Sequence, residues 1–463
     1  MKKRLFYKIF LVMALSVYSS CSSNDGADNE NVHDVPYSSE KPIVVSSLGP
    51  TEGGLGTRVV VGGSNFGNDA SKVKLLFNKK EAVILKIQNN AIYAMVPKQP
   101  GDLSTIKVQV QDGLDETGTP LYKEAVLENV QFKYNIKATV TTVAGQWRDY
   151  YAYETKVADG MALEAHFGRP VHLAVDDEGT VLIVDDNGGK MVRMYSIPDN
   201  KVTTVLSNLN QPWQCSFNLD FSRFYVIERN SSSRPLLFYS LSKESNWQTA
   251  EAFYDQRDED GEWMSEGSNA YGLAADDKYV YVLTDKGKRL LRVDQGTRKV
   301  EVIGKNLDLG AWPQMAFNPK NRLLYICNED RGFLYRLNPY YTPEGHDTPW
   351  ITQAEVEHIV GNGVGVAVEG NGKNATIGKL EACAADHEGN VYLCDWYNYC
   401  IWKVDEDLNT TILAGRLEWD YYYRDGAPRE AAFYEPYGVA ATPDGIVYVA
   451  DTYNYCIRCI AIQ

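Results

Sequence analysis

Short runs of alternating apolar residues, separated by glycine and other turn residues, dominate this chain and predict β-strands rather than helices. Residues 139–145 read Thr-Val-Thr-Thr-Val-Ala-Gly, a β-branched run with a glycine stop. Near-copies at 202–205 and 410–415 each end a repeated unit, whereas the copy at 139–145 precedes the first unit. The final unit, which ends at Gln463, has no such strand. We therefore expect residues 139–143 to pair with the last unit and complete it.

From residue 138 onward the pattern repeats with a period of roughly 40 residues, which is typical of β-propellers. The clearest unit, residues 433–458, has a Pro, a Pro-Asp-Gly turn, an apolar strand ending at Asp451 and an Asn shortly after it. Asp185 and Asp395 end the corresponding strands of two other units. Because an Asp at a turn can accept hydrogen bonds from backbone N–H groups, we interpret these aspartates as structural. Three further units start near residues 212, 270 and 313 and have less regular turns.

These repeats resemble the NHL-repeat family, and the resemblance implies a β-propeller of six four-stranded blades over residues 137–463, closed by the strand at 139–143. A second resemblance covers residues 42–136. Glycine turns such as Gly63-Ser-Asn-Phe-Gly and a Val96-Pro pair among short strands resemble an IPT/TIG immunoglobulin-like domain. The expected fold is therefore all-β: an N-terminal immunoglobulin-like β-sandwich, with Asn65 as a turn residue and Phe66 in the core, followed by the propeller.

The first 41 residues carry a targeting pattern. Residues 1–20 combine a basic start with an apolar run too short to span a bilayer permanently, which predicts a signal peptide. Small residues before Cys21 resemble a bacterial lipoprotein signal, in which this cysteine is lipidated. Residues 21–41 form an acidic flexible tether whose carboxylates resemble the surface-export signal of Bacteroidetes lipoproteins, although an ordinary acidic tether has the same composition. We expect an outer-membrane, lipid-anchored protein that faces the cell exterior.

Charge and cysteine usage narrow the possible functions. The 463-residue chain has 46 basic and 61 acidic residues and a net charge of −15, which argues against nucleic-acid partners and against docking on anionic lipid. Seven cysteines remain besides Cys21, and their repeated places in strands predict small buried apolar residues, with a disulfide between neighbouring strands left open. No Cys/His spacing indicates a zinc site, and we expect no metal and no cofactor.

Aromatic side chains in the linkers are the clearest candidate for a binding site, since the chain has 31 Tyr and 9 Trp. Two equivalent linkers, before the first and the last unit, are rich in them, and both should reach the face that receives the turns after each second strand. The first residues of the innermost strands should line the mouth of the central channel on that face. The candidate ligand-binding residues are Trp147, Tyr150, Tyr151, Trp213, Tyr271, Gln314, Glu381, Trp396, Tyr397, Trp419, Tyr421, Tyr422 and Tyr437. Alternatively, the linker aromatics pack down as loop core.

Such a mouth suits a sugar, whose C–H faces stack on aromatic rings while carboxylates and amides bind hydroxyl groups. The combination of lipid anchor, tether, immunoglobulin-like domain and propeller resembles surface glycan-binding lipoproteins that hold polysaccharide near an outer-membrane importer. We therefore expect a non-catalytic cell-surface protein that binds a glycan. A protein-binding or adhesion module is one alternative. A metal-dependent propeller lactonase or lyase is another, although Glu381, Gln314 and His172 are few ligands for a channel metal.

Overall fold

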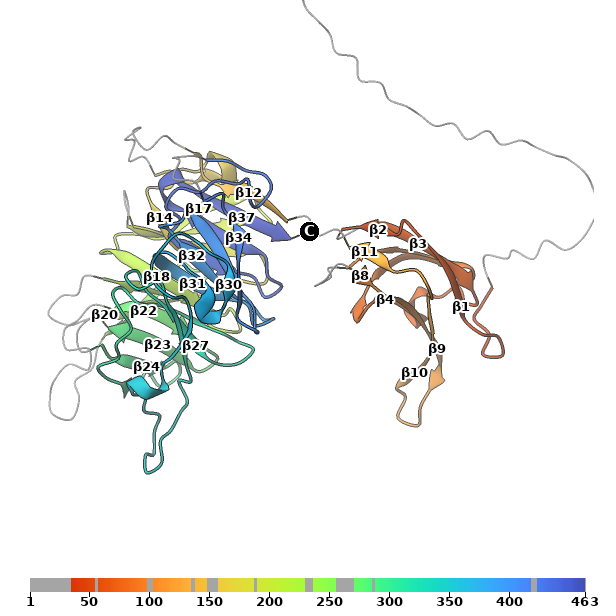
Figure 1. Cartoon of the computed structure of the whole chain (residues 1–463), viewed down its shortest axis with the longest axis horizontal. Coiled ribbons are helices and arrows are strands. Elements are labelled where there is room, and N and C mark those ends of the chain that lie inside the picture. The colour runs from red at the N-terminus through yellow and green to blue at the C-terminus, as the bar shows by residue number, and fades with distance from the viewer. Residues whose placement is uncertain are drawn as a thin grey trace, which may run out of the picture. The chain divides into compact units, whose positions relative to one another are not determined.

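The structure, a computed structural model, describes residues 35–54, 57–97, 103–134, 138–147, 157–186, 190–229, 236–254, 270–284, 288–417 and 423–462. These residues form β-strands and five short 3₁₀ helices and no α-helix, so the prediction of an all-β chain is confirmed for this part. None of the described residues belongs to a helix long and apolar enough to cross a membrane. The chain divides into two compact units, Met1–Asn135 and Ile136–Gln463 (Figure 1).

The first unit consists of three sheets around one apolar core. One sheet has the order β1 (Val44–Gly49), β3 (Arg58–Ser64), β7 (Ala91–Met95), β6 (Val83–Gln88). The second has β10 (Pro120–Val126), β9 (Ile106–Leu114), β4 (Val73–Phe77), β5 (Lys80–Glu81), and η1 (Ala70–Lys72) precedes β4. The third joins β2 (Glu52–Gly53), β11 (Phe132–Tyr134) and β8 (Leu103–Ser104).

The period-2 pattern of the sequence explains how these sheets pack. In β4 the buried Val73, Leu75 and Phe77 alternate with half-buried residues, and Phe77 meets Phe132 edge to face at 5.3 Å. Asn65 adopts φ 64° and its amide donates to the Ser38 and Lys41 carbonyls, which confirms its role in a turn. Phe66 is buried in the core, as predicted.

The described residues of the second unit form six sheets with four main strands each. The first three are β14 (Pro170–Val175), β15 (Thr180–Asp185), β16 (Met191–Ser196), β17 (Lys201–Leu206); β18 (Pro212–Phe217), β19 (Arg223–Glu228), β20 (Leu236–Ser242), β21 (Ala250–Tyr254); and β22 (Ala270–Ala275), β23 (Tyr279–Thr284), β24 (Leu290–Asp294), β25 (Val300–Gly304). The others are β26 (Gln314–Phe317), β27 (Leu324–Cys327), β28 (Leu334–Leu337), β29 (Glu357–Val360); β31 (Leu380–Ala385), β32 (Val391–Asp395), β33 (Cys400–Val404), β34 (Asn409–Ala414); and β35 (Gly438–Ala441), β36 (Val447–Asp451), β37 (Cys456–Ile462), β12 (Ala138–Ala144). Short elements in the linkers are β13 (Gly160–Met161), β30 (Gly370–Asn371), η2 (Ala162–Glu164), η3 (Gln353–Glu355), η4 (Gly372–Asn374) and η5 (Thr452–Asn454).

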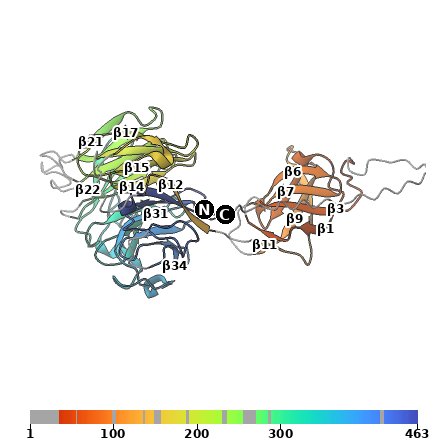
Figure 2. The same ribbon diagram turned by 90° about the horizontal axis from the view of Figure 1, so that it is seen from above.

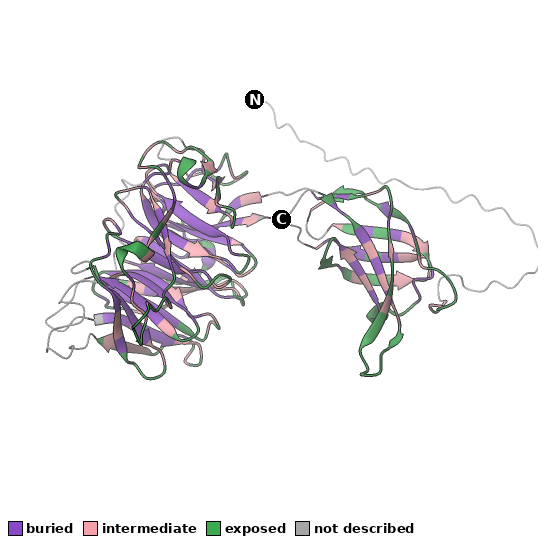
Figure 3. Ribbon diagram, turned by 60° about the horizontal axis from the view of Figure 1, so that its bottom comes forward, coloured by how far each residue is buried: buried purple, intermediate pink, exposed green. Residues whose placement is uncertain are grey.

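These six sheets stand around a common centre in a propeller-like arrangement. The first strand of each sheet contacts the first strand of the next, from β14 through β18, β22, β26 and β31 to β35, and β35 contacts β14. Figure 2 shows β14 and β31 toward the middle of this unit and β17, β21 and β34 toward its rim. Every residue of the inner strand β14 is buried, and Figure 3 shows buried residues throughout the sheets of this unit. The inner strands thus read as apolar runs because both of their faces are covered.

The outer strand of the last sheet comes from an early part of the chain. β12 pairs antiparallel with β37, with Val140 opposite Ile460 and Thr141 opposite Cys459. On its other side, the N–H group of Thr142 donates to Asp425 of the linker before β35. Asp159 accepts from Thr204 of β17 and Glu369 accepts from Ile412 of β34 in the same way. β12 therefore takes the place in its sheet that β17 and β34 take in theirs.

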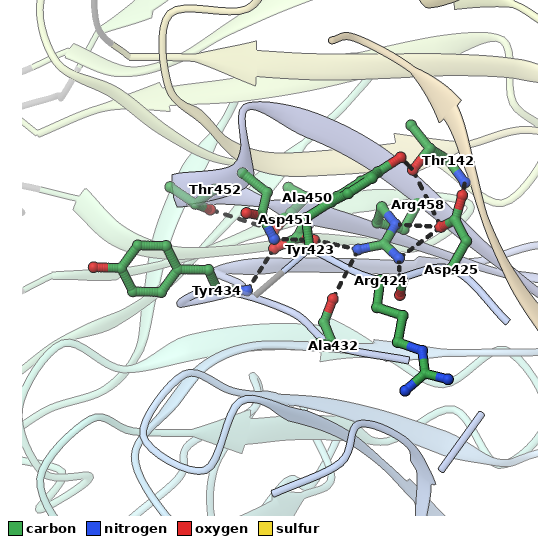
Figure 4. Close-up of polar contacts among 11 residues, drawn as sticks. Thr142, Tyr423, Arg424, Asp425, Ala432, Tyr434, Ala450, Asp451, Thr452 and Arg458 are labelled. Atoms are coloured by element: carbon green, nitrogen blue, oxygen red, sulfur yellow. Dashed lines mark hydrogen bonds and ion pairs between the residues drawn. The ribbon is translucent and has the colours of Figure 1, made fainter. Parts of the chain in front are cut away.

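The repeated aspartates Asp185, Asp395 and Asp451, at the ends of three second strands, tie their sheets to the linkers before them. Asp185 accepts from the N–H groups of Gly168 and Arg169, and Asp451 accepts from that of Tyr434. In the last sheet the buried guanidinium of Arg458 joins Asp451 to Asp425, as Figure 4 shows. The predicted bonding to backbone N–H groups is confirmed, although the donors to Asp185 and Asp451 lie 16 or 17 residues upstream rather than in the local turn.

The seven cysteines other than Cys21 are all buried and free of disulfides, which confirms their interpretation as small apolar residues. Burial raises the pKa of the Cys215 thiol, so this group stays protonated at neutral pH.

Candidate functional site

One end of the inner strands gathers the chemically interesting residues. Each first strand starts beside the end of its second strand, as the pairs Pro170–Asp185, Pro212–Glu228 and Leu380–Asp395 show. Side chains that flank these points therefore meet at the same end of the six sheets. We call the following set the mouth: Arg169, Trp213, Arg229, Tyr271, Trp312, Gln314, Glu381, Trp396, Tyr437 and Tyr453.

Aromatic rings from different sheets are linked across the mouth. Tyr437 lies 6.3 Å from Trp213, 6.3 Å from Trp396 and 6.0 Å from Tyr453, measured between ring centroids. Tyr271 meets Trp312 edge to face at 4.9 Å. The fold thus brings six of the predicted residues to one place: Trp213, Tyr271, Gln314, Glu381, Trp396 and Tyr437.

Arg229 connects the two aromatic groups. Its guanidinium carbon lies 3.3 Å from the centroid of Trp213, 4.9 Å from Trp312 and 5.9 Å from Tyr271. A guanidinium over the face of an indole is a favourable cation–π geometry, and it gains strength when water is excluded. Burial lowers the pKa of Arg229, while Glu381 acts in the opposite direction.

Gln314 and Gln214 hold the wall of the mouth in place. With its amide oriented to satisfy both ends, Gln314 accepts from the Trp213 indole N–H at 3.1 Å and donates to the Gln214 side-chain oxygen at 3.0 Å. Gln214 in turn accepts from the N–H of Leu273 and donates to the Met315 carbonyl. The Gln314 amide therefore has protein partners and positions Trp213, rather than being free for a ligand.

Glu381 and His172 are the buried titratable groups below the aromatic rings. Glu381 is 5 % exposed, and burial raises its pKa to about 8, with Glu329 adding to the shift and Arg229 and Arg169 opposing it. His172 is 3 % exposed and packs against Trp213 at 5.3 Å. Burial, reinforced by Arg229, lowers its pKa to about 3, so its imidazole is neutral at physiological pH.

Two cavities open beside the mouth. One of about 440 Å³ lies next to Tyr271 and Trp312 and is also lined by Lys288, Asp330 and Arg331. The other, of about 370 Å³, is lined by Arg169, Asp186, Lys190, Gln211 and Arg229. Both are in the size range of small-ligand sites. They provide space for a ligand that also lies on the aromatic rings.

Other predicted residues lie elsewhere or outside the described part. Trp147 is 49 % exposed and stacks on Tyr423 at 5.9 Å between ring centroids, and the guanidinium carbon of Arg458 lies 4.9 Å from the centroid of the Tyr423 ring. Among the described residues this stack makes no ring contact with the mouth. Tyr397 is half-buried. Tyr150, Tyr151, Trp419, Tyr421, Tyr422 and Cys21 lie outside the described residues.

Sequence reasoning missed Arg229, Trp312 and Arg169. Aligning the residue directly after the second strand of three sheets would have shown Asp186, Arg229 and Trp396 in equivalent places. The residues directly before the first strands of the same three sheets are Arg169, Gln211 and Lys379, and Trp312 lies two residues before β26. Both positions face the mouth, so charged or aromatic residues there are the signal that was overlooked. Lys379, for example, places its ammonium 5.2 Å from the ring of Trp396.

The arrangement offers binding chemistry. Among the described residues, no group of three or more His, Cys, Asp or Glu side chains is placed to hold a metal ion. The mouth instead combines apolar aromatic faces with guanidinium, ammonium and amide donors at its edge.

Comparison with known families confirms both resemblances in part. Residues 42–134 match the IPT/TIG domain, and residues 433–460 match the NHL repeat. A stretch of 82 residues is 40% identical to the protein SUPPRESSOR OF QUENCHING 1, chloroplastic, of Arabidopsis thaliana. This stretch is 18% of the chain and spans only 7% of that curated relative.

Solved structures match nearly the whole chain. A structural genomics protein of unknown function from Bacteroides thetaiotaomicron VPI-5482 is 26% identical, with a TM-score of 0.72, covering 93% of this chain and 100% of that one. An auxiliary nutrient binding protein from the same organism is 23% identical (TM-score 0.58, 92% and 99% covered). Another from Bacteroides ovatus ATCC 8483 is 22% identical (TM-score 0.59, 93% and 100% covered). At these identities the latter two show a shared fold.

Proposed function

We propose that this chain is a non-catalytic binding protein of the cell surface that captures a glycan at the mouth of a six-bladed β-propeller. The cyclic contacts from β14 to β35 and the β12–β37 ladder support the six blades and their closure by an early strand. The nutrient-binding names of two proteins with the same fold support a binding role. The observation that carries the proposal is the mouth itself, where aromatic rings from several sheets adjoin two cavities.

Trp312 and Tyr437 have the geometry that a sugar ring needs. Trp312 is 41 % exposed beside the cavity of about 440 Å³, and Tyr437 lies between Trp213 and Trp396. A sugar presents C–H groups to such rings and hydroxyl groups to charged or amide side chains around them. Each aromatic contact contributes about 0.5–1.5 kcal/mol, so several are needed for useful affinity.

Affinity electrophoresis of the purified protein in gels that contain neutral and acidic polysaccharides tests the proposal. Retardation by at least one polymer is expected. Trp312→Ala and Tyr437→Ala should each weaken binding about twofold to tenfold, since each removes one aromatic contact. Tyr341→Ala is the matched control, because Tyr341 is exposed in the β28–β29 connection. Binding to no polysaccharide, or equal loss in the control, would overturn the glycan proposal and favour a protein partner.

Anchoring through lipidated Cys21 and an importer partner complete the proposed function. Delivery to the outer surface would place the mouth where polysaccharide is found, and an outer-membrane importer would take up the captured glycan. Replacement of Cys21 by Ser should release the protein from the membrane fraction. Protease treatment of intact cells should degrade the wild-type protein if it faces outward, and survival of the protein would argue for an inward orientation.

A further inference from the structure

The cavity of about 370 Å³ beside the mouth is unusually basic for this chain. Its lining residues are Arg169, Asp186, Lys190, Gln211 and Arg229, so three cations face one carboxylate. The whole chain carries a net charge of −15. Like charges brought together in a partly enclosed space repel one another unless an opposite charge joins them. The cavity therefore lacks negative charge in a protein that has an excess of it elsewhere.

The one carboxylate in the lining is already used. Arg169 donates from Nε to Asp186 at 2.6 Å and makes a second bond from Nη2 to the other carboxylate oxygen, a bidentate ion pair. Although burial lowers the pKa of Arg169, this pair raises it overall. Lys190 makes no ion pair with a described carboxylate, although its charge acts on Glu228. None of the described carboxylates forms an ion pair with Arg229, and its Nε is buried without a hydrogen-bond partner.

The stacking of Arg229 presents its donors to the cavity. Trp213 and Trp312 lie against the guanidinium, at 3.3 Å and 4.9 Å from its carbon. A guanidinium has its N–H groups in its plane, so contacts with its faces leave the edge free. That edge matches the two oxygens of a carboxylate or a sulfate. Glu381 is the carboxyl that acts most strongly on Arg229, but burial raises its pKa to about 8, so it stays largely uncharged at pH 7.

We propose that this cavity binds the negatively charged group of an acidic glycan, a carboxylate or a sulfate ester, while the sugar ring lies on the adjoining aromatic side chains. Arg229 forms the bidentate contact and Lys190 adds a second cation, and Gln211 and Asp186 are placed for hydroxyl groups of the same sugar. This inference rests on the proposed function and specifies its ligand class: uronic-acid or sulfated polysaccharides are preferred over neutral ones.

The test is affinity electrophoresis of the full chain with polygalacturonate, alginate and dextran sulfate as acidic probes and dextran and galactan as neutral probes. Acidic probes should bind more tightly, and the preference should fall when NaCl is raised. Arg229→Gln should lower affinity for acidic probes roughly tenfold or more, and affinity for neutral probes by a much smaller factor, because Arg229 also packs on Trp213 and Trp312. Lys190→Gln, at an exposed position, should also lower the affinity for acidic probes, but by a smaller factor than Arg229→Gln. Arg336→Gln is the control, since Arg336 pairs with Glu357 on a third strand away from the mouth.

Each outcome decides between the two proposals. Binding of acidic probes that is unaffected by both Arg229→Gln and Lys190→Gln, or equally reduced by Arg336→Gln, overturns the basic cavity as the site. Binding of the protein to neutral probes but to no acidic probe overturns the acidic-glycan inference and leaves the proposal of glycan binding intact. Binding of no probe overturns both. The relative use of polygalacturonate and dextran sulfate separates carboxylate from sulfate recognition.

Discussion

The backbone N–H of Thr142 donates to the carboxylate of Asp425 at 3.0 Å, across 283 residues of sequence. The neighbouring Val140 N–H donates to the Gly426 carbonyl on the same side. Because successive residues of a strand point their N–H groups to opposite sides, the backbone N–H of Thr141 points toward β37. β12 is thus held from both sides, by the last sheet and by the linker before it.

Thr141→Pro should destabilise the second unit by about 1–3 kcal/mol, because proline removes a donor from the β12–β37 ladder. Urea unfolding followed by intrinsic fluorescence measures the change. Thr342→Pro is the control, since Thr342 is exposed and already precedes a proline. Equal stability of Thr141→Pro and the wild type would contradict closure by β12.

Arg458 should be the most sensitive buried charge in the last sheet. It is fully buried and donates to Asp451, Asp425 and two backbone carbonyls (Figure 4). Removing one partner of such a network leaves the other charge buried and unpaired, which costs about 3–5 kcal/mol. Arg458→Ala should therefore lower the free energy of unfolding by that amount. Arg424→Ala should change it by less than about 0.5 kcal/mol, because the Arg424 side chain is largely exposed.

The repeated strand pattern carried most of the fold prediction. Alternating apolar residues and glycine turns identify strands locally, and an unpaired Thr-Thr-Val copy points to its distant partner, since period and register are properties of the sequence itself. The candidate binding site is harder to predict from the sequence than the fold. Aromatic residues such as Trp213 and Tyr437 were found because they stand in repeated positions. Arg229 is harder to recognise, because its role depends on which rings surround it, and the contacts of Gln314 with Gln214 and Trp213 are visible only in the fold.

Gln314→Leu tests whether this residue positions Trp213. The substitution leaves the Trp213 indole N–H without its acceptor, which should cost about 1–3 kcal/mol of stability. Tryptophan emission of the folded protein should change, and glycan affinity should fall although Gln314 itself contacts no ligand in our proposal. Gln248→Leu, at an exposed position, is the control and should change neither property. Unchanged emission and affinity in Gln314→Leu would show that the aromatic wall holds without this amide.

Glu381 should make the stability of the second unit depend on pH in an unusual direction. Burial, followed by repulsion from Glu329, raises its pKa from 4.5 to about 8, while Arg229 and Arg169 oppose the shift. The folded state therefore holds a proton that the unfolded state releases above about pH 4.5. The stabilising contribution is complete below that pH and is lost as the pH rises through about 8. The size of the effect is on the order of a few kcal/mol, since each pKa unit corresponds to about 1.4 kcal/mol.

Glu381→Gln removes this proton linkage. The variant and the wild type should have similar stability near pH 4.5, and the variant should become the more stable of the two as the pH approaches 8. Thermal unfolding at several pH values measures the difference between them. Glu344→Gln, in an exposed loop, controls for general charge effects and should follow the wild type at every pH. A stability difference that does not grow with pH would mean that Glu381 is ionised in the folded protein at neutral pH, and its charge would then compete with an anionic ligand for Arg229.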